Sequence, residues 1–301
     1  MPSLYAHQII ANKVFDRMGK PTYIKNKYNE FLLGSMGLDM FNYHKLLKMF
    51  ANSPLDSLGS ALKYAKHKDF LLALIEYSKG DVGQMVYVMG FITSYAADRT
   101  VRPYIHSRTE KPEGGGDVIK QIEFEQALDA YLYREGELED DVVQADFLKK
   151  IKRRQMRHVS KLISSVCRHI FPGRRIWKKD IVAAYLDTKV FTQKINKHAA
   201  DATKKMRLYE GMIGKMGRLT IFVPPQIIQG NDVFNLARRT WRAPFAMHAA
   251  RNESVIDLME LSVDLSIDLI NRLNEYYLGD SEIEHVEKMI CNINFNGREM
   301  E

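Results

Sequence analysis

Apolar residues recur every three to four positions along most of this chain, which is the spacing of an amphipathic α-helix. One such face near the start of the sequence carries His7, Ile10, Val14 and Met18. A long pattern of the same kind extends over residues 251–278. No internal repeat and no linker-like composition divides the sequence. We therefore predict an all-α chain that folds as a single multi-helix domain over residues 1–301.

Glycine and proline mark where the helical patterns stop. Residues 55–79 are predicted to form one or two helices that end at Gly80, and a new helical pattern begins at Val82. Residues 106–117 contain a proline and three consecutive glycines, a composition typical of a mobile loop. This loop lacks the Gly-Lys-Ser/Thr ending of a phosphate-binding loop, so it does not indicate a nucleotide site.

Composition narrows the class of protein. The longest apolar runs, such as Val86–Phe91, are far too short to span a bilayer. The segment Met1–Lys20 lacks the basic and apolar regions of a secretory signal. Cys167 and Cys291 lie far apart without CxxC spacing, so we expect two reduced thiols and neither a disulfide nor a zinc site. We therefore expect a cytoplasmic protein without a transmembrane segment.

One region has a strongly one-sided charge. Residues 149–179 contain twelve Lys or Arg and no Asp or Glu, within a chain of net charge +7. Two interpretations of Lys149–Lys179 stay open. It is a surface for an anionic membrane or nucleic acid, or it is a solvated face offset by the acidic residues of 135–146. No helix-turn-helix, RRM or zinc-finger pattern accompanies it, which argues against sequence-specific readout.

Three polar residues, Ser94, Asp98 and Arg102, stand out within the apolar stretch Gly90–Tyr104. Their spacing of four places them on one face of a helix, one turn apart. Burying polar or charged groups without partners is costly, so this face requires partners inside the molecule. The pattern alone also fits a core helix with one satisfied Asp, since lone buried charges are rare.

This stretch resembles the zinc-ligand helix of the bacterial zinc-dependent phospholipase C family, which is related to the S1/P1 nucleases. The family helix carries His, then Asp four residues on, then His after four more, followed by Pro-Tyr. Here Asp98 and the Pro-Tyr pair match, whereas Ser94 and Arg102 stand at the two histidine positions. The resemblance implies an all-α domain of the phospholipase C/P1 nuclease type with an altered metal site.

Two further segments resemble metal-binding positions of the family. The opening MPSLYAH places His7 where the family has a ligand near its N-terminus. Residues 31–44 contain Asp39 and, five residues on, His44, as in the relatives. Carboxylate and imidazole groups suit zinc or iron. On pattern alone, a lone His is more often a packing or surface residue, and Asp39 also suits a helix N-cap.

The helix expected over residues 118–134 matches the family less well. The family has His, then Glu four residues on, then Asp after four more. Aligning Glu125 and Asp129 with these acids puts Gln121 at the histidine position, and Glu123 is a poorer alternative to Glu125. On pattern alone, the commoner fate of such acids is a solvated helix face.

The resemblance continues towards the C-terminus and so covers nearly the whole chain. The residues of GNDVFNLARRTWRAPF that match the family are Asp232, Asn235, Trp241 and Pro244. The closing segment CNINFNGREM has the family's Asn, aromatic residue and Gly. The loop of residues 106–117, which lies between two ligand helices of the family, is implied to be a lid over the site.

Carrying the family's ligands over residue by residue leaves five candidate metal ligands: His7, Asp39, His44, Asp98 and Glu125. The implied cofactor is zinc or another divalent metal at a reduced site, or no metal at all. An ion that loses several ligands dissociates, so catalysis by the family's three zinc ions is not expected.

Arg102 offers another way to neutralise the buried carboxylates. Unpaired buried carboxylates are costly, and a guanidinium is a fixed positive fork that binds two carboxylates at once. Our hypothesis is that Arg102 replaces a metal ion as the internal counter-charge. In an active enzyme the catalytic residues would be Asp39, as a ligand of the metal that activates water, and Arg102, which would stabilise the transition-state charge.

Three functions stay open. The favoured one is a diverged phospholipase C-like protein with weak or no phosphodiester hydrolysis that binds a phosphate-bearing ligand, such as a phospholipid, or a partner protein. The second is an active metal-dependent phosphoesterase with a one- or two-metal site. The third is association with an anionic membrane or nucleic acid through Lys149–Lys179.

Overall fold

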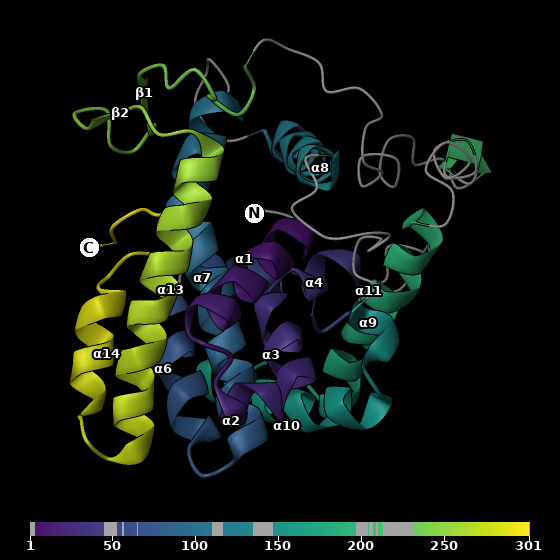
Figure 1. Cartoon of the computed structure of the whole chain (residues 1–301). Coiled ribbons are helices and arrows are strands. Elements are labelled where there is room, and N and C mark those ends of the chain that lie inside the picture. Colours follow the sequence, from purple (N-terminus) through teal and green to yellow (C-terminus); the bar gives the residue numbers. More distant parts are fainter. Residues whose placement is uncertain are drawn as a thin grey trace.

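The computed structural model describes residues 4–44, 53–55, 57–64, 66–109, 117–134, 147–196, 204, 207–208, 210–212 and 232–300. Within these residues the chain is mostly helical, which confirms the all-α class (Figure 1). The helices are α1 (Leu4–Arg17), α2 (Thr22–Lys25), α3 (Tyr28–Ser35), α4 (Met40–Tyr43), α5 (Leu58–Tyr64), α6 (His67–Ser78), α7 (Val82–Thr109), α8 (Val118–Arg134), α9 (Phe147–Lys150), α10 (Arg153–Ile170), α11 (Lys178–Asn196), α13 (Val255–Leu278) and α14 (Ile283–Ile290). The glycine triplet of the expected loop and the acidic segment 135–146 lie outside the described residues, as does the double-proline segment at 218–229.

Helix α7 runs through the centre of the molecule and packs against α3 and α13. Two glycines set how closely α3 approaches it. A Cβ atom on Gly90 would collide with the carbonyl oxygen of Phe31, and a Cβ atom on Gly34 would collide with that of Tyr87. The two backbones are therefore in direct contact. This contact brings the turn after α3, which contains Asp39, to the middle of α7.

Helix α13 begins later than the apolar pattern predicts, at Val255 instead of residue 251. The reason is a capping box. The Ser254 hydroxyl accepts a hydrogen bond from the Asp257 amide at 3.1 Å, and the Asp257 carboxylate accepts one from the Ser254 amide at 3.0 Å. At the other end, Gly279 adopts a left-handed φ of 86°, which suits glycine.

The only strands in the described residues, β1 (Trp241–Arg242) and β2 (Ala250–Arg251), form an antiparallel pair. The family-matching residues of this region have structural contacts. The Asn235 side chain donates to the Arg239 carbonyl and accepts from its amide, both at 2.9 Å. The Trp241 indole donates to the Glu253 carbonyl at 3.1 Å, and its ring meets Tyr104 of α7 edge-on at 5.2 Å. These contacts fix the segment to α7 and to the start of α13.

The C-terminal segment after α14 lies along α7. The Tyr95 hydroxyl donates to the Ile293 carbonyl at 2.7 Å, and Arg99 donates to the Met289 carbonyl at 3.0 Å. Gly297 has a φ of 73° and lies so close to the Arg99 carbonyl that any side chain there would collide with it. This docking carries Asn296 to the face of α7 that holds Arg102.

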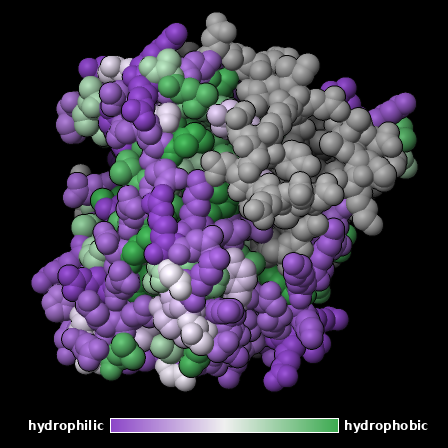
Figure 2. All heavy atoms as spheres, viewed as in Figure 1, coloured by the Kyte–Doolittle hydropathy of each residue, from purple (hydrophilic) through white to green (hydrophobic). Residues whose placement is uncertain are grey.

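The surface of the described residues is mainly hydrophilic on the face shown in Figure 2. None of the helices in these ranges combines the length and apolar character needed to cross a bilayer. Cys167 is a buried free thiol and Cys291 an exposed one.

Candidate functional site

Three of the five candidate ligands meet in the interior. His7 comes from α1, Asp39 from the turn between α3 and α4, and Asp98 from the middle of α7. The His7 Nδ1 atom lies 3.4 Å from Asp39 Oδ2, and its Nε2 atom lies 3.5 Å from Asp98 Oδ1. All three side chains are buried. Together with Arg102 they form what we call the buried charged cluster.

The imidazole of His7 stands between the two carboxylates. One ring nitrogen faces Asp39 and the other faces Asp98, so the carboxylates lie on opposite edges of the ring. Both distances are longer than a normal hydrogen bond. A metal ion binds one nitrogen of an imidazole, whereas here each ring nitrogen faces a different carboxylate. An ion bound to a single ring nitrogen would therefore face only one of the two carboxylates.

Arg102 supplies a cation to the cluster. Its Nε atom lies 3.5 Å from Asp98 Oδ1, and its Nη1 atom donates to Asn296 Oδ1 at 2.8 Å. Burial alone would raise the pKa of Asp98, but Arg102 and His7 outweigh burial and hold that pKa well below its usual range. Asp98 therefore stays ionised inside the protein.

The partly exposed edge of the cluster carries His106 and Gln121, and the Gln121 amide is the donor of the pair. His106 lies one turn beyond Arg102 on α7, and its Nδ1 atom is 3.4 Å from Gln121 Nε2 of α8. Burial and the positive charge of Arg102 lower the pKa of His106 to about 4, against the opposing effect of a hydrogen bond with Asn296. His106 is therefore neutral near pH 7.

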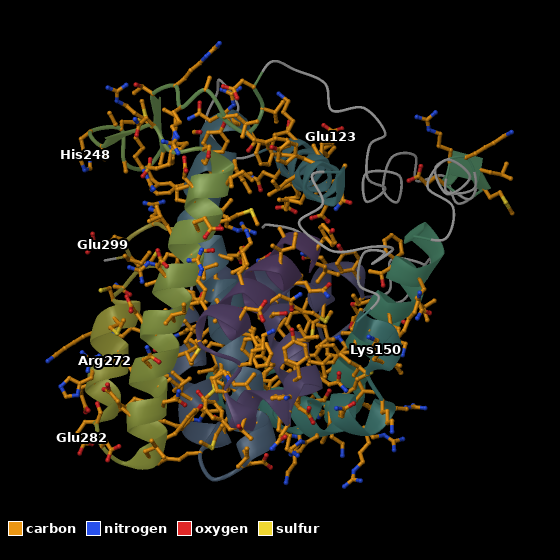
Figure 3. All side chains as sticks on the ribbon, in the orientation of Figure 1. Glu123, Lys150, His248, Arg272, Glu282 and Glu299 are labelled. Carbon is orange, nitrogen blue, oxygen red and sulfur yellow. The ribbon has the colours of Figure 1, made fainter. Side chains whose placement is uncertain are left out.

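The acids of α8 lie on another side of the cluster. Asp129 accepts a hydrogen bond from the Ala6 amide in the first turn of α1 at 3.3 Å. Burial raises the pKa of Tyr43 well above its usual range, and the charges of Asp39, Asp129 and Glu125 raise it further. Glu125 thus lies within electrostatic reach of Tyr43, as does Asp39 of the cluster, whereas Glu123 is exposed on the outer side of α8 (Figure 3).

His44 contacts a different set of residues. Its Nδ1 atom lies 2.9 Å from Asp187 Oδ2 of α11, and its Nε2 atom lies 3.0 Å from Ser53 Oγ. Both ring nitrogens are therefore engaged, and either would have to be released before it could bind a metal. The contacts described for His44 do not join it to Asp39 or Asp98.

Ser94, at the first altered histidine position, is engaged within its own helix. Its hydroxyl donates to the Phe91 carbonyl at 2.8 Å. Gly37, with a φ of 54°, is packed so closely that a Cβ atom there would collide with the Ser94 hydroxyl. The turn after α3 therefore covers this position.

Sequence reasoning missed three residues of this region. Asn296 holds Arg102, His106 lies beside both, and Asp187 holds His44. The closing Asn of the resemblance was a weak signal for Asn296. No spacing in the sequence connects Asp187 with His44, because the two meet through the packing of α11 against α4.

The family's zinc site stays a prediction for this chain. Among the described residues, no group of three or more His, Cys, Asp or Glu side chains has an arrangement that could hold a metal ion. Searches of family models, curated proteins and solved structures found no match to this chain. The family assignment therefore rests on the sequence resemblance alone.

Proposed function

We propose that this chain is a diverged phospholipase C-like protein that binds a phosphate-bearing ligand and has weak or no family-type phosphodiester hydrolysis. The observation that supports this most is the position of Arg102, against Asp98 and held by Asn296. A cation of the chain itself stands where the resemblance places a metal ligand. We expect the protein to act in the cytoplasm.

At the altered positions Arg102 and Gln121, hydrogen-bond donors stand in place of metal ligands. A histidine that binds a metal offers a lone pair, whereas Arg102 and Gln121 present N–H groups. Arg102 and His106 both contact Asn296, and Gln121 lies beside His106 at the partly exposed edge of the cluster. Phosphate oxygens accept hydrogen bonds, and a guanidinium is the side chain best matched to them. These donors favour an anion over a cation.

A metal-dependent phosphoesterase with a reduced site is the second candidate. The meeting of His7, Asp39 and Asp98 favours it, because all three are ligand positions of the resemblance. The contacts of His44 and the bridging position of His7 weigh against it. Hydrolysis needs an activated water, and the described residues offer no group of three ligands for the metal that would supply it.

Phosphate binding can be tested by calorimetric titration with inorganic phosphate and with phosphocholine. We expect saturable binding to the wild-type chain. Gln121→Glu, which places a carboxylate beside His106, should weaken binding more than tenfold through repulsion of the anion. The control is Lys120→Gln, an exposed neighbour on α8 whose substitution changes the net charge by the same amount. Equal binding by wild type and Gln121→Glu, or no binding by wild type, would overturn the proposal.

Hydrolysis is tested separately with a chromogenic phosphodiester in the presence of zinc or manganese. We expect no difference between wild type and Asp98→Asn. A wild-type rate that falls by about a hundredfold or more in Asp98→Asn would establish the metal-dependent phosphoesterase instead.

A further inference from the structure

The outer face of α10 and the segment that follows it carry a dense set of exposed cations. We call this set the basic surface, and it consists of Lys152, Arg153, Arg154, Arg157, Lys161, Arg168, Arg175, Lys178 and Lys179. The opposite face of α10, including Val159, Leu162 and Val166, is fully buried in the core. The fold therefore fixes the direction in which these charges point. In Figure 1, α10 lies at the opposite end of the molecule from β1 and β2.

The cations of the basic surface are not engaged in ion pairs in the described part of the chain. None of its nine cations forms an ion pair with a described Asp or Glu side chain. The acids that contact this helix do so through uncharged or histidine side chains: Asp81 lies 2.8 Å from His158, and Glu30 accepts a hydrogen bond from Gln155 at 3.2 Å. Arg153, Arg157 and Lys161 follow one another at spacings of four, where like charges repel. A negatively charged partner would relieve this repulsion.

An aromatic residue stands at the end of the basic surface. The Trp177 side chain is 52% exposed, although a ring of this size usually contributes to a core. The Arg168 guanidinium carbon lies 6.0 Å from the centre of its ring. Tryptophan beside cations is typical of the interface between water and a lipid bilayer, where the ring sits at headgroup level.

A bilayer fits this surface better than a nucleic acid does. Single-stranded nucleic acids are held in a positive groove by several aromatic rings on which bases stack. Here the cations lie on the convex outside of a helix, and two aromatic rings are each approached by a guanidinium: Trp177 by Arg168 and Phe171 by Arg174. Headgroup attraction requires neither a groove nor free ring faces.

We infer that the basic surface docks the chain onto anionic phospholipid bilayers, with Trp177 entering the headgroup region. The cations would contact phosphate and carboxylate groups of many lipids at once. The apolar side of α10 stays in the core, so the protein would lie on the membrane without inserting this helix. This inference does not depend on the phosphate site proposed above.

Vesicle flotation tests the inference directly. We expect the full-length chain to float with vesicles of phosphatidylcholine mixed with phosphatidylserine, and not with phosphatidylcholine alone. Binding should weaken steeply as salt is raised, because salt screens exposed charges. In Arg157→Glu/Lys161→Glu the partition coefficient should fall by about tenfold or more, since two attractive charges become repulsive.

The matched control is Arg239→Glu/Arg242→Glu. Both arginines are exposed, and they lie in the segment around β1 at the far end of the molecule. The control makes the same change in net charge. It therefore distinguishes binding through the basic surface from binding that depends only on the net charge of the chain. It should retain at least half of the wild-type partitioning. Equal losses in the two double variants would overturn the inference.

Tryptophan fluorescence gives a second readout. The chain has two tryptophans, and Trp241 is only 7% exposed. Acrylamide quenching therefore reports mainly on Trp177, and anionic vesicles should reduce it in wild type but not in Trp177→Phe. The inference fails if anionic vesicles do not bind. A nucleic-acid surface would give a different pair of results. The inference also fails if an oligonucleotide displaces the chain fully from the vesicles and if vesicles do not change the quenching of Trp177.

Discussion

The buried charged cluster and the basic surface both gather charge, but they differ in where the opposite charge is found. In the cluster, Asp98 and Asp39 meet His7 and Arg102 within the protein. On the basic surface, the nine cations have no acidic partner among the described residues. A buried charge must be neutralised for the chain to fold, whereas an exposed charge is solvated by water and tolerates the absence of a partner.

The difference indicates what each region is for. Charges that neutralise one another hold the fold together, and removing one leaves its partner buried and unpaired. Charges that remain uncompensated at the surface contribute little to stability and are available to an external partner. Substitutions should therefore affect folding in the first region and binding in the second.

The largest expected effect is at Arg102. Arg102→Met removes a cation from beside the buried Asp98 while keeping an unbranched side chain. We expect the free energy of unfolding to fall by about 3–5 kcal/mol, because an uncompensated charge stays in the core. Urea denaturation followed by circular dichroism measures this change. The control is Arg108→Met on the same helix, an exposed position where we expect a change within about 0.5 kcal/mol.

A double-mutant cycle sharpens this prediction. If Arg102 acts as the counter-charge of Asp98, then Asp98→Asn should recover part of the loss caused by Arg102→Met. Purely additive effects would mean that Arg102 stabilises the fold only through Asn296 and packing. Unchanged stability in Arg102→Ala would remove the basis of the counter-charge account.

The next effect is a pH dependence from His106. Its pKa is about 4 in the folded protein and about 6.5 as the ordinary value. Below pH 6.5 the unfolded chain therefore binds the proton first, so stability falls as the pH decreases from about 6.5 to 4. The loss should be on the order of 1–3 kcal/mol. The groups that face His106 are Arg102, Asn296, Gln121 and Phe245.

Thermal unfolding across this pH range tests the assignment. His106→Gln should flatten the decline, because the substituted side chain does not titrate. His285→Gln, at an exposed position on α14, should leave the decline as in wild type. The reverse pattern would show that another group causes the pH dependence.

A smaller effect is expected at His158, where α10 contacts an acid. His158 Nε2 and Asp81 Oδ2 lie 2.8 Å apart, and both side chains are more than one third exposed. Because water screens such a pair, His158→Gln should lower the free energy of unfolding by about 1 kcal/mol at most. A loss as large as that of Arg102→Met would contradict the division between the two regions.

The smallest effect on stability is expected on the basic surface itself. Arg157→Glu/Lys161→Glu should change the free energy of unfolding by no more than about 0.5 kcal/mol. The two substitutions remove like charges that repel Arg153. This gain in stability partly offsets what the helix loses in solvation and helix propensity. Urea denaturation of this variant also verifies that its vesicle binding is measured on folded protein. A marked loss of stability would show that these cations have partners within the fold.

Much of the fold could be predicted from the sequence, because helical periodicity records which face of each segment is buried. The apolar pattern that begins at Val82 predicted the central helix. This helix, α7, extends to Thr109, whereas the loop was expected to start at residue 106. The end of α13 at Gly279 also follows from local chemistry. Of the five candidate ligands from the resemblance, the structure brings His7, Asp39 and Asp98 together.

The remaining features depend on packing between distant segments. Asn296 reaches Arg102 because the C-terminal segment lies along α7, and no local pattern specifies this contact. His44 faces Asp187 because α11 packs against α4. The orientation of the His7 ring, with one nitrogen towards each carboxylate, is likewise set by the approach of three separate elements. Metal binding, hydrolysis and the family assignment stay predictions.

The central claim is that Arg102, and not a metal ion, is the counter-charge of the carboxylates in the buried charged cluster. Elemental analysis of the purified chain tests it most directly, before and after chelator dialysis and after reloading with zinc, iron or manganese. We predict that no ion is retained in stoichiometric amount under any of these conditions. One or more tightly held ions per chain, lost from Asp98→Asn, would contradict the claim and make the cluster a working metal site.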